Sequence, residues 1–154
     1  MNYNWGAVGD IPTQGDYDGD GKTDLAIYRP STGAWWILES SANYTTYATY
    51  NWGVDGDIPV TGDYDGDGKT DIAIYRPSTG AWWILQSSGG YFTKNWGISG
   101  DIAMPGDYDG DGKADLAMYR PSNGSWWVLQ SSTGYTTFFA RLWGISGDVP
   151  VPRR

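Results

Sequence analysis

The chain has 154 residues, with 18 acidic against 10 basic side chains and a formal net charge of -8. It contains no cysteine and no histidine, which excludes disulfide scaffolds, thiolate nucleophiles, histidine-dependent triads and the usual zinc sites. An acidic chain without a basic patch is a poor binder of nucleic acid, and no apolar run reaches the roughly 18 residues of a membrane-spanning helix. We therefore expect no nucleic-acid partner and no membrane insertion, and the first six residues do not resemble a signal peptide.

In chain order, the first unit reads as a series of short strands separated by turns. Residues 10–15 form a weak strand that leads into an aspartate-rich loop at 16–24. Residues 25–28 favour a strand that ends at an Arg-Pro pair, because proline blocks further pairing. A Ser-Thr-Gly turn precedes a strand at 34–38, so these two strands form a hairpin. Alternating Tyr and Thr predict a further strand over 44–51.

The same series occurs three times along the chain. Each unit contains the Asp loop, an apolar strand ending in Tyr-Arg-Pro, a turn with glycine, a Trp-Trp pair and a Trp-Gly pair. The Trp-Gly pairs begin at Trp5, Trp52, Trp96 and Trp143. We divide the single repeat domain, 1–154, into units of about 5–51, 52–95 and 96–142, with 143–154 as a partial fourth unit. The close similarity of the units indicates recent duplication or a designed protein.

The repeating unit predicts the fold class. Four short strands in about 45 residues, with no helical periodicity, are typical of a propeller blade. We therefore expect an all-β fold with three blades of four antiparallel strands. The alternative is a β-trefoil, which also has three four-stranded units in a chain of this length, although the Asp loop does not match that family.

The loop pattern Asp-x-Asp-x-Asp-Gly-x-x-Asp predicts a calcium site. Alternate aspartates direct three carboxylates inward, and the glycine after the third permits a sharp turn around an ion. The next residue is a lysine that would offer its backbone carbonyl, and the last aspartate adds one more carboxylate. A shell of hard oxygen ligands suits calcium better than zinc, copper or magnesium. Without a cation, four aspartates within one short loop would repel one another.

The loop differs from an EF-hand in an informative way. Its first six positions match, but an EF-hand has a bidentate Glu at position twelve, where this chain has Ile27, Ile74 and Met118. An apolar strand begins where the exiting helix of an EF-hand would start. We therefore expect a calcium loop that lies between β-strands.

Residues 15–30 read Gly-Asp-Tyr-Asp-Gly-Asp-Gly-Lys-Thr-Asp-Leu-Ala-Ile-Tyr-Arg-Pro, which resembles the FG-GAP/VCBS repeat. The resemblance covers nearly the whole chain three times over, and this family includes the blades of the integrin α-chain propeller and many bacterial secreted proteins. It implies a calcium loop between the first two strands of each blade and about one calcium ion per repeat. The implied ligands are Asp16, Asp18, Asp20, the Lys22 carbonyl and Asp24, then Asp63, Asp65, Asp67, Lys69 and Asp71, then Asp107, Asp109, Asp111, Lys113 and Asp115.

The number of blades raises the question of closure. Propellers of the family usually have six to eight blades, whereas this chain encodes three. A three-blade arc would expose two apolar blade faces, and a propeller needs about four to eight blades to close. We therefore expect self-association, with a dimer completing a six-bladed ring of closed two-fold symmetry. The partial fourth unit would overlap a neighbouring chain or mark where a longer array was cut.

Candidate ligand contacts lie on and beside the central strands. Successive strand residues point to opposite faces, and both faces of a blade pack on neighbours, so the Trp-Trp pairs are expected mainly in the core. The alternative is a repeated sugar-stacking platform that gains avidity from multivalency. The candidate contacts are Trp36, Trp83, Trp127, Arg29, Arg76 and Arg120.

These patterns predict a non-catalytic, calcium-binding propeller module that serves as an interaction or scaffold domain, with a carbohydrate or a protein as ligand. The alternative is a calcium-dependent, lectin-like carbohydrate-binding protein. No catalytic residue is predicted, because nearly all carboxylates belong to repeat motifs and Glu39 is replaced by Gln86 and Gln130 in the other units. Extracellular calcium modules bind with dissociation constants of roughly 10⁻⁴ to 10⁻³ M, so an extracellular or cell-surface location is expected.

Overall fold

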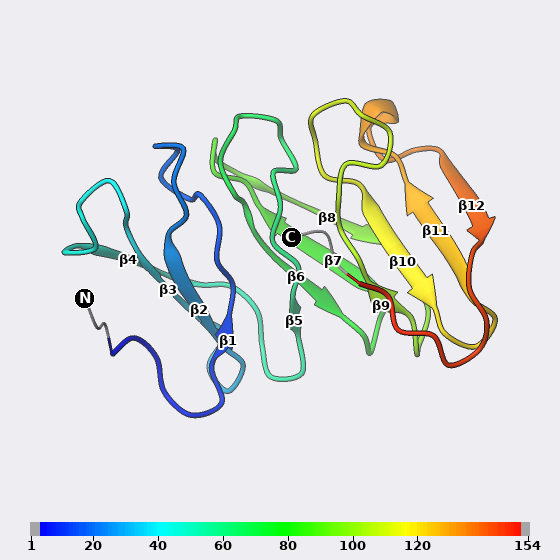
Figure 1. Ribbon diagram of the computed structural model, residues 1–154, viewed down its shortest axis with the longest axis horizontal. Coiled ribbons are helices and arrows are strands. Elements are labelled where there is room, and N and C mark those ends of the chain that lie inside the picture. The colour runs from blue at the N-terminus through cyan, green and yellow to red at the C-terminus, as the bar shows by residue number, and fades with distance from the viewer. Residues whose placement is uncertain (1–3, 152–154) are drawn as a thin grey trace.

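The computed structural model describes residues 4–151, and it contains three four-stranded antiparallel sheets arranged along the longest axis of the molecule (Figure 1). Blade 1 consists of β1 (Ile11–Pro12), β2 (Leu25–Arg29), β3 (Ala34–Leu38) and β4 (Tyr47–Asn51). Blade 2 consists of β5 (Ile58–Pro59), β6 (Ile72–Arg76), β7 (Ala81–Leu85) and β8 (Tyr91–Asn95). Blade 3 consists of β9 (Ile102–Ala103), β10 (Leu116–Arg120), β11 (Ser125–Leu129) and β12 (Phe138–Leu142), with a 3-10 turn η1 (Ser131–Thr133) before β12.

Each strand pairs with the strand that follows it in sequence, so every repeat forms its own sheet. This arrangement confirms the predicted fold class of all-β, propeller-like blades. It does not fit the trefoil alternative, because the strands of different repeats do not share a sheet. Within residues 4–151, no helix has the length and apolar character needed to cross a membrane. Residues 152–154 of the predicted partial fourth unit lie outside the described residues.

The hairpins of the three blades form where the sequence predicts them. In blade 1 the turn closes through Gly33, whose N–H donates to the Arg29 carbonyl at 2.9 Å. Gly33 has a φ of 69°, and a β-carbon there would collide with the carbonyl oxygen of Gly53, which lies in the connector between blades 1 and 2 (residues 52–57). The glycine is therefore required both by the turn and by the close approach of the following chain.

Two predicted strands are shorter in the structure. β4 begins at Tyr47 and not at residue 44, because Asn43 and Tyr44 have positive φ angles of 53° and 58° and form a turn. The first strand covers Ile11–Pro12 in place of 10–15, and the ladder resumes only as an isolated bridge at the base of the Asp loop. Positive φ at residues other than glycine is rare, and composition alone does not indicate it.

The hydrophobic core lies between the blades. Because side chains alternate along a strand, each blade has two apolar faces. We call the face with Tyr28 and Trp35 the front face of blade 1, the face with Leu25, Ile27 and Trp36 its back face, and use the same names in the other blades. We call the contact between two neighbouring blades a joint. At the first joint, the front face of blade 1 and the back face of blade 2 form one hydrophobic cluster, and at the second joint a similar cluster connects blades 2 and 3.

Candidate metal centres

Each Asp loop lies between the first and second strands of its blade, at the end where β2, β6 and β10 begin (Figure 1). In blade 1 the carboxylate of Asp16 accepts hydrogen bonds from the backbone N–H groups of Gly19 and Gly21, at 2.7 and 2.8 Å. Both glycines have a φ of 83°, in the left-handed region that other residues adopt only at a cost. The glycines therefore allow the chain to curl around this carboxylate.

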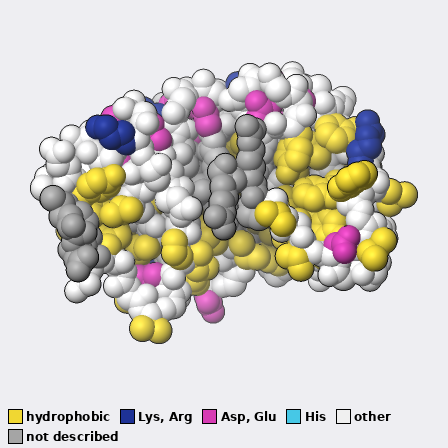
Figure 2. Space-filling model, viewed as in Figure 1, with side chains coloured by type: hydrophobic (Ala, Val, Ile, Leu, Met, Phe, Trp, Pro, Cys, Tyr) yellow, Lys and Arg dark blue, Asp and Glu magenta, His cyan; other side chains and the backbone are white. Residues whose placement is uncertain are grey.

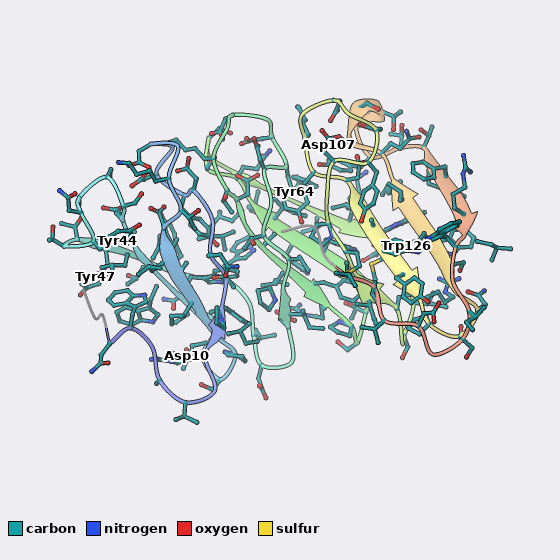
Figure 3. All side chains as sticks on the ribbon, in the orientation of Figure 1. Asp10, Tyr44, Tyr47, Tyr64, Asp107 and Trp126 are labelled. Carbon is teal, nitrogen blue, oxygen red and sulfur yellow. The ribbon has the colours of Figure 1, made fainter. Side chains whose placement is uncertain are left out.

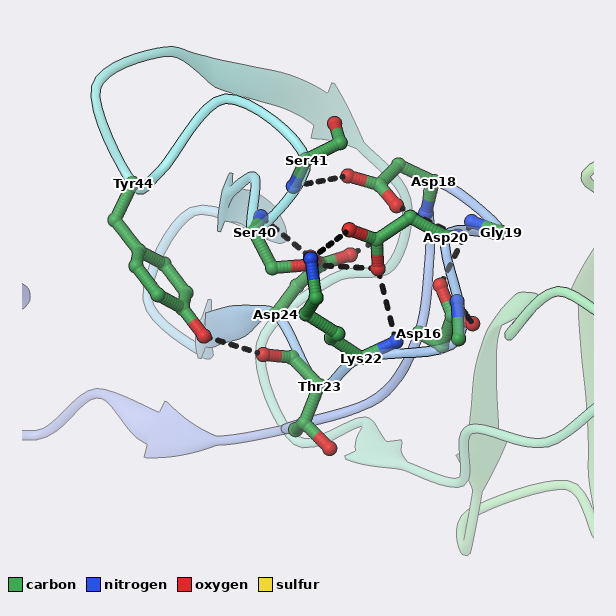
Figure 4. A network of polar contacts seen from close by, with 11 residues as sticks. Asp16, Asp18, Gly19, Asp20, Lys22, Thr23, Asp24, Ser40, Ser41 and Tyr44 are labelled. Atoms are coloured by element: carbon green, nitrogen blue, oxygen red, sulfur yellow. Dashed lines mark hydrogen bonds and ion pairs between the residues drawn. The ribbon is translucent and has the colours of Figure 1, made fainter.

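The last aspartate of each loop is buried and held by backbone donors. Asp24 is 0% exposed, and its carboxylate accepts the N–H group of Tyr17 at 2.8 Å. It also accepts the N–H group of Ser40 at 2.8 Å (Figure 4). The equivalent bonds at Asp71 and Asp115 have lengths of 2.7 to 2.8 Å. Hydrogen bonds from backbone N–H groups stabilise the ionised carboxylate and fix its position before any cation arrives.

Three carboxylates converge in each loop. The three groups are Asp16, Asp18 and Asp24, then Asp63, Asp65 and Asp71, then Asp107, Asp109 and Asp115, and in each group the oxygen atoms lie within 4.8 Å of one another. Calcium binds oxygen at about 2.3–2.6 Å, so two ligands of one ion lie at most about 5 Å apart. The residues present therefore fit one hard, oxygen-ligated cation per loop, such as calcium.

The negative charge of these groups is not balanced by side chains within residues 4–151. The one ion pair that involves a loop aspartate there joins Lys22 Nζ to Asp20 Oδ2 at 3.3 Å, and Asp20 lies outside the group. Burial raises the pKa of Asp71, because a desolvated carboxylate is costly to ionise. A divalent cation would offset both this desolvation and the mutual repulsion of the three carboxylates.

The structure does not place the third aspartate of each loop, Asp20, Asp67 or Asp111, within the converging groups. Asp20 instead accepts the Lys22 N–H at 2.8 Å and the Ser40 hydroxyl at 3.0 Å. The backbone carbonyl of Lys22 accepts no hydrogen bond from the part of the chain that the structure describes, and the same holds at Lys69 and Lys113. These three carbonyls are therefore free to act as the predicted ligands.

Sequence reasoning missed a pair of serines that closes each loop. Ser40 donates its N–H to Asp24 and its hydroxyl to Asp20, and Ser41 donates its N–H to Asp18 at 3.2 Å (Figure 4). Hydrogen bonds from the equivalent serines lower the pKa of Asp67 in blade 2 and of Asp109 in blade 3. The signal was present in the sequence as a Ser-Ser pair at 40–41, 87–88 and 131–132.

The candidate arginines lie at the opposite end of each blade. Arg29 donates from Nε and Nη2 to the two carboxylate oxygens of Asp10, both at 2.8 Å. The equivalent bidentate pairs are Arg76 with Asp57 and Arg120 with Asp101. The hydrogen bond from Arg29 lowers the pKa of Asp10, and the same bond raises the pKa of Arg29. The first role of these arginines is therefore to neutralise a carboxylate of their own blade.

The candidate tryptophans lie beside these arginines. The guanidinium carbons of the three arginines lie 6.0, 5.5 and 5.2 Å from the ring centroids of Trp36, Trp83 and Trp127. Each of these pairs lines a small hollow together with the tryptophan of a Trp-Gly pair, and the hollows have volumes of about 160, 200 and 210 Å³. The first tryptophans of the pairs in blades 1 and 2, Trp35 and Trp82, are fully buried in the core. The structure thus brings predicted Trp and Arg candidates together three times.

The fold and the loops define an all-β repeat protein built of propeller-like blades, each with an acidic loop between its first two strands. The family profile of the FG-GAP-like repeat matches residues 16–74 and 63–118, which together span more than half of the chain. The chain therefore belongs to the FG-GAP-like repeat family, as the resemblance of its loops predicted. No curated protein and no solved structure matches the chain significantly.

Proposed function

We propose that the chain is a non-catalytic interaction module of the propeller type, in which one calcium ion stabilises each blade. The observation that carries this proposal is the convergence of three carboxylates in every loop, with no cationic side chain paired to them within residues 4–151. Each ion would be held by those carboxylates and by the lysine carbonyl of the same loop, with water filling the remaining positions. This is the mixed oxygen shell that calcium accepts and that magnesium accommodates less readily.

The proposed role of the ion is structural, because its ligands connect the segments of a blade. Asp16 follows β1, and Asp24 leads directly into β2. Asp24 is also bonded to Ser40, which follows β3. A cation on these carboxylates would therefore hold the ends of three strands at one point.

Thermal unfolding of the full chain in calcium and in chelator tests this proposal. A ligand that binds only the folded state adds about 2.7 kcal/mol per independent site at a free concentration 100 times its dissociation constant. Three such sites, with dissociation constants of roughly 10⁻⁴ to 10⁻³ M, would raise the melting temperature strongly at about 10 mM calcium, and magnesium at the same concentration would raise it less. An identical melting curve in calcium and chelator would refute the structural role.

Matched aspartate variants separate this binding from a general charge effect. Asp65→Asn removes one carboxylate from a converging group, whereas Asp55→Asn removes the same charge from an exposed connector residue outside the groups. Asp65→Asn should reduce the calcium-induced rise in melting temperature by about one third, since it disables one of three equivalent sites. Asp55→Asn should leave the rise unchanged.

Glu39, one of the two acidic residues outside the repeat motifs, has a structural partner. Glu39 accepts a hydrogen bond from the Thr46 hydroxyl at 2.8 Å. At the equivalent place in blade 3, the hydroxyl of Thr137 lies 3.5 Å from the side-chain oxygen of Gln130. Because a neutral glutamine occupies the same place, this contact supports a role for Glu39 in joining strands, in line with a non-catalytic module.

We also propose an extracellular or cell-surface location. Sites of this kind bind calcium at roughly 10⁻⁴ to 10⁻³ M, a range in which they would be filled outside cells and largely empty in the cytosol. Calcium titration of the full chain tests this point. A dissociation constant below about 10⁻⁶ M would instead fit an intracellular sensor or buffer.

A second candidate function, carbohydrate binding, rests on the repeated Trp–Arg hollows. In blade 2 the hollow is lined by Trp52, Ile74, Arg76 and Trp83 together with residues 51, 53 and 54, an arrangement with an aromatic surface and a polar group for a sugar ring. A glycan array in millimolar calcium, with Trp83→Ala as the comparison, tests this candidate. Glycan binding that this substitution weakens would support it, and an array without any bound glycan would reject it.

A further inference from the structure

The two joints between blades show how one blade receives the next. At the first joint, Trp35 on the front face of blade 1 packs in one cluster with Ile72 on the back face of blade 2. At the second joint, Trp82 and Leu116 occupy the equivalent positions. The front and back faces are therefore complementary surfaces, and each blade carries both.

One copy of each surface has no neighbouring blade within residues 4–151, and it is exposed only in part, since Ile27 on the back face of blade 1 is 7% exposed and Tyr119 on the front face of blade 3 is 1% exposed. On the back face of blade 1, Leu25 is 38% exposed, whereas the equivalent Ile72 is 5% exposed at the first joint. On the front face of blade 3, Tyr108 is 43% exposed, whereas the equivalent Tyr64 is 2% exposed at the second joint. Figure 2 shows hydrophobic side chains gathered over blade 3. The two exposed faces are thus the two halves of one further joint.

Polar groups of the loops are left unmatched at the same two faces. Within the chain, Thr70 N–H donates to the Asp16 carbonyl at 2.7 Å, and Ala114 N–H donates to the Asp63 carbonyl at 2.6 Å. The next donor and acceptor in this series are Thr23 N–H on blade 1 and the Asp107 carbonyl on blade 3, and neither makes such a bond within the described residues. Both groups lie on the exposed faces, so they would match across a further joint.

The lysines of the loops also make contacts at the internal joints that are missing at the two terminal faces. The side chain of Lys69 lies over Gly19 in the loop before it, so closely that a β-carbon on the glycine would meet the lysine at 2.8 Å. Gly110, the equivalent glycine of blade 3, has open space around it. The lysine that would cover it is the counterpart of Lys22, whose side chain is 69% exposed.

The connector between blades 1 and 2, residues 52–57, bonds to both blades. It bonds to blade 1 through the Trp52 carbonyl, which accepts the Trp35 indole N–H at 2.7 Å. It bonds to blade 2 through Asp57, which pairs with Arg76. A complete connector therefore carries two sets of contacts, one to each side of the joint.

Two further segments, residues 5–10 and 143–148, have the sequence pattern of this connector, but each makes only one of the two sets of contacts. Residues 143–148 bond to the blade before them, since the Trp143 carbonyl accepts the Trp126 indole N–H at 3.1 Å. Asp148, however, pairs with no arginine in the described part of the chain, and the Trp143 side chain is 82% exposed. Residues 5–10 show the opposite pattern, because Asp10 pairs with Arg29 but no blade lies before them within residues 4–151.

We propose that the partner of this chain is a second copy of itself, bound head to tail. The front face of blade 3 receives the back face of blade 1 of the second copy, and residues 143–148 take the place that residues 5–10 hold on that blade. Asp148 then pairs with Arg29 of the second copy, and the Asp107 carbonyl accepts its Thr23 N–H. The occupant is a second copy because the chain itself shows, at both internal joints, that these two faces fit each other.

The number of copies follows from the range over which propellers close. Rings of about four to eight blades are known to close, so two chains of three blades satisfy this range and three chains exceed it. The assembly is therefore a closed dimer with two identical joints. This proposal deepens the interaction role proposed above by naming the partner, and it involves faces distinct from the carboxylate oxygens.

Sedimentation of the full chain between about 1 μM and 1 mM, in calcium, tests the proposal. The expected result is a reversible dimer of twice the 16.9 kDa chain mass. Leu25→Arg and Trp143→Arg each place a charge on one half of the joint and should weaken association by about tenfold or more. Ile58→Arg, at an exposed position of the central blade that lies on neither open face, is the matched control and should associate like the unsubstituted chain.

Mixing the two face variants distinguishes head-to-tail packing from every other arrangement. The Leu25→Arg chain keeps its front face and the Trp143→Arg chain keeps its back face, so a mixture forms a heterodimer through one intact joint, which also shows that both chains are folded. A monomer at all concentrations, open chains larger than a dimer, an equal loss in Ile58→Arg, or no recovery on mixing would each overturn the proposal. Calcium titration of the monomeric Trp143→Arg chain measures cation binding without dimerisation. Failure of the dimer proposal can therefore be distinguished from failure of the calcium proposal.

Discussion

The carboxylates at one end of each blade are paired with an arginine, whereas those that converge at the other end have no cationic side chain beside them within the described residues. At one end of blade 2, Asp57 is paired with Arg76 through two hydrogen bonds of 2.7 and 2.8 Å. At the other end, Asp63, Asp65 and Asp71 converge without a cationic side chain from the described residues. Figure 3 shows the corresponding ends by Asp10 in blade 1 and Asp107 in blade 3.

The two ends of a blade depend differently on the solution around the protein. An arginine is always charged and always present, so the Asp–Arg end is balanced under all ordinary conditions. Within the described residues, the converging carboxylates at the loop end accept hydrogen bonds only from backbone N–H groups and serine hydroxyls, which orient them without cancelling their charge. We therefore expect the stability of the loop end, and not that of the Asp–Arg end, to follow the cation concentration.

The largest expected effect is at the Asp–Arg end. Arg76→Ala leaves Asp57, which is 4% exposed, without its counter-charge and should lower the free energy of unfolding by about 3–5 kcal/mol. Chemical denaturation in calcium measures this loss. Arg76→Lys keeps the charge but not the bidentate geometry, so it should show an intermediate loss, and a loss below about 1 kcal/mol for Arg76→Ala would contradict the comparison.

The second largest effect is that of Asp65→Asn on the free energy of unfolding, and it depends on whether calcium is present. Asp65→Asn should lower the free energy of unfolding by about 2–3 kcal/mol when calcium is at 100 times its dissociation constant. In chelator the same substitution should leave the stability unchanged or raise it slightly, because it removes one of three repelling charges. Denaturation curves under both conditions measure the reversal. A similar loss in chelator would mean that the loop is not a cation site.

A smaller effect is expected from the serine that closes the loop. The Ser87 hydroxyl donates to Asp67 at 2.7 Å, so Ser87→Ala should lower the free energy of unfolding by about 1 kcal/mol and weaken calcium binding modestly. Ser78→Ala, in an exposed hairpin turn, is the control and should change neither quantity. Equal behaviour of the two variants in a calcium titration would show that the serine pair does not support the site.

The smallest effect concerns pH at the Asp–Arg end. The hydrogen bond from Arg29 lowers the pKa of Asp10 below its ordinary value of 3.8. The resulting stabilisation is fully present above that ordinary value and is lost as the pH falls through the lowered pKa. The melting temperatures of the chain and of Asp10→Asn, measured in chelator from neutral to strongly acidic pH, should therefore converge at the acidic end. A difference that stays constant across this range would contradict the assignment.

Much of this architecture could be predicted because it repeats in the sequence. The threefold Asp loop and the Tyr-Arg-Pro and Trp-Trp elements indicated the blades, the hairpins and the place of the candidate sites. The boundary of β4 could not be predicted, since it depends on positive φ angles at Asn43 and Tyr44. Asparagine adopts such conformations more readily than most residues, but tyrosine rarely does, so the residue types alone do not predict two positive φ angles in succession.

The composition of the sites was only partly predictable. Asp10 and Arg29 both belonged to repeated elements, but their pairing joins residues that are far apart in the sequence. The serine pair was equally visible as a repeat, yet its role depends on the fold, which brings the end of β3 back to the loop. The position of Asp20 outside the converging group likewise reflects its bonds to Lys22 and Ser40 and not the spacing of the motif.

The most direct test of the cation account is the number of calcium ions bound by the chelator-stripped full chain, measured by calorimetric titration. The three converging groups predict three ions per chain, and Asp65→Asn should bind two. An absence of binding up to about 10 mM calcium, well above the range of extracellular modules, would contradict the account. So would a stoichiometry that Asp65→Asn leaves unchanged.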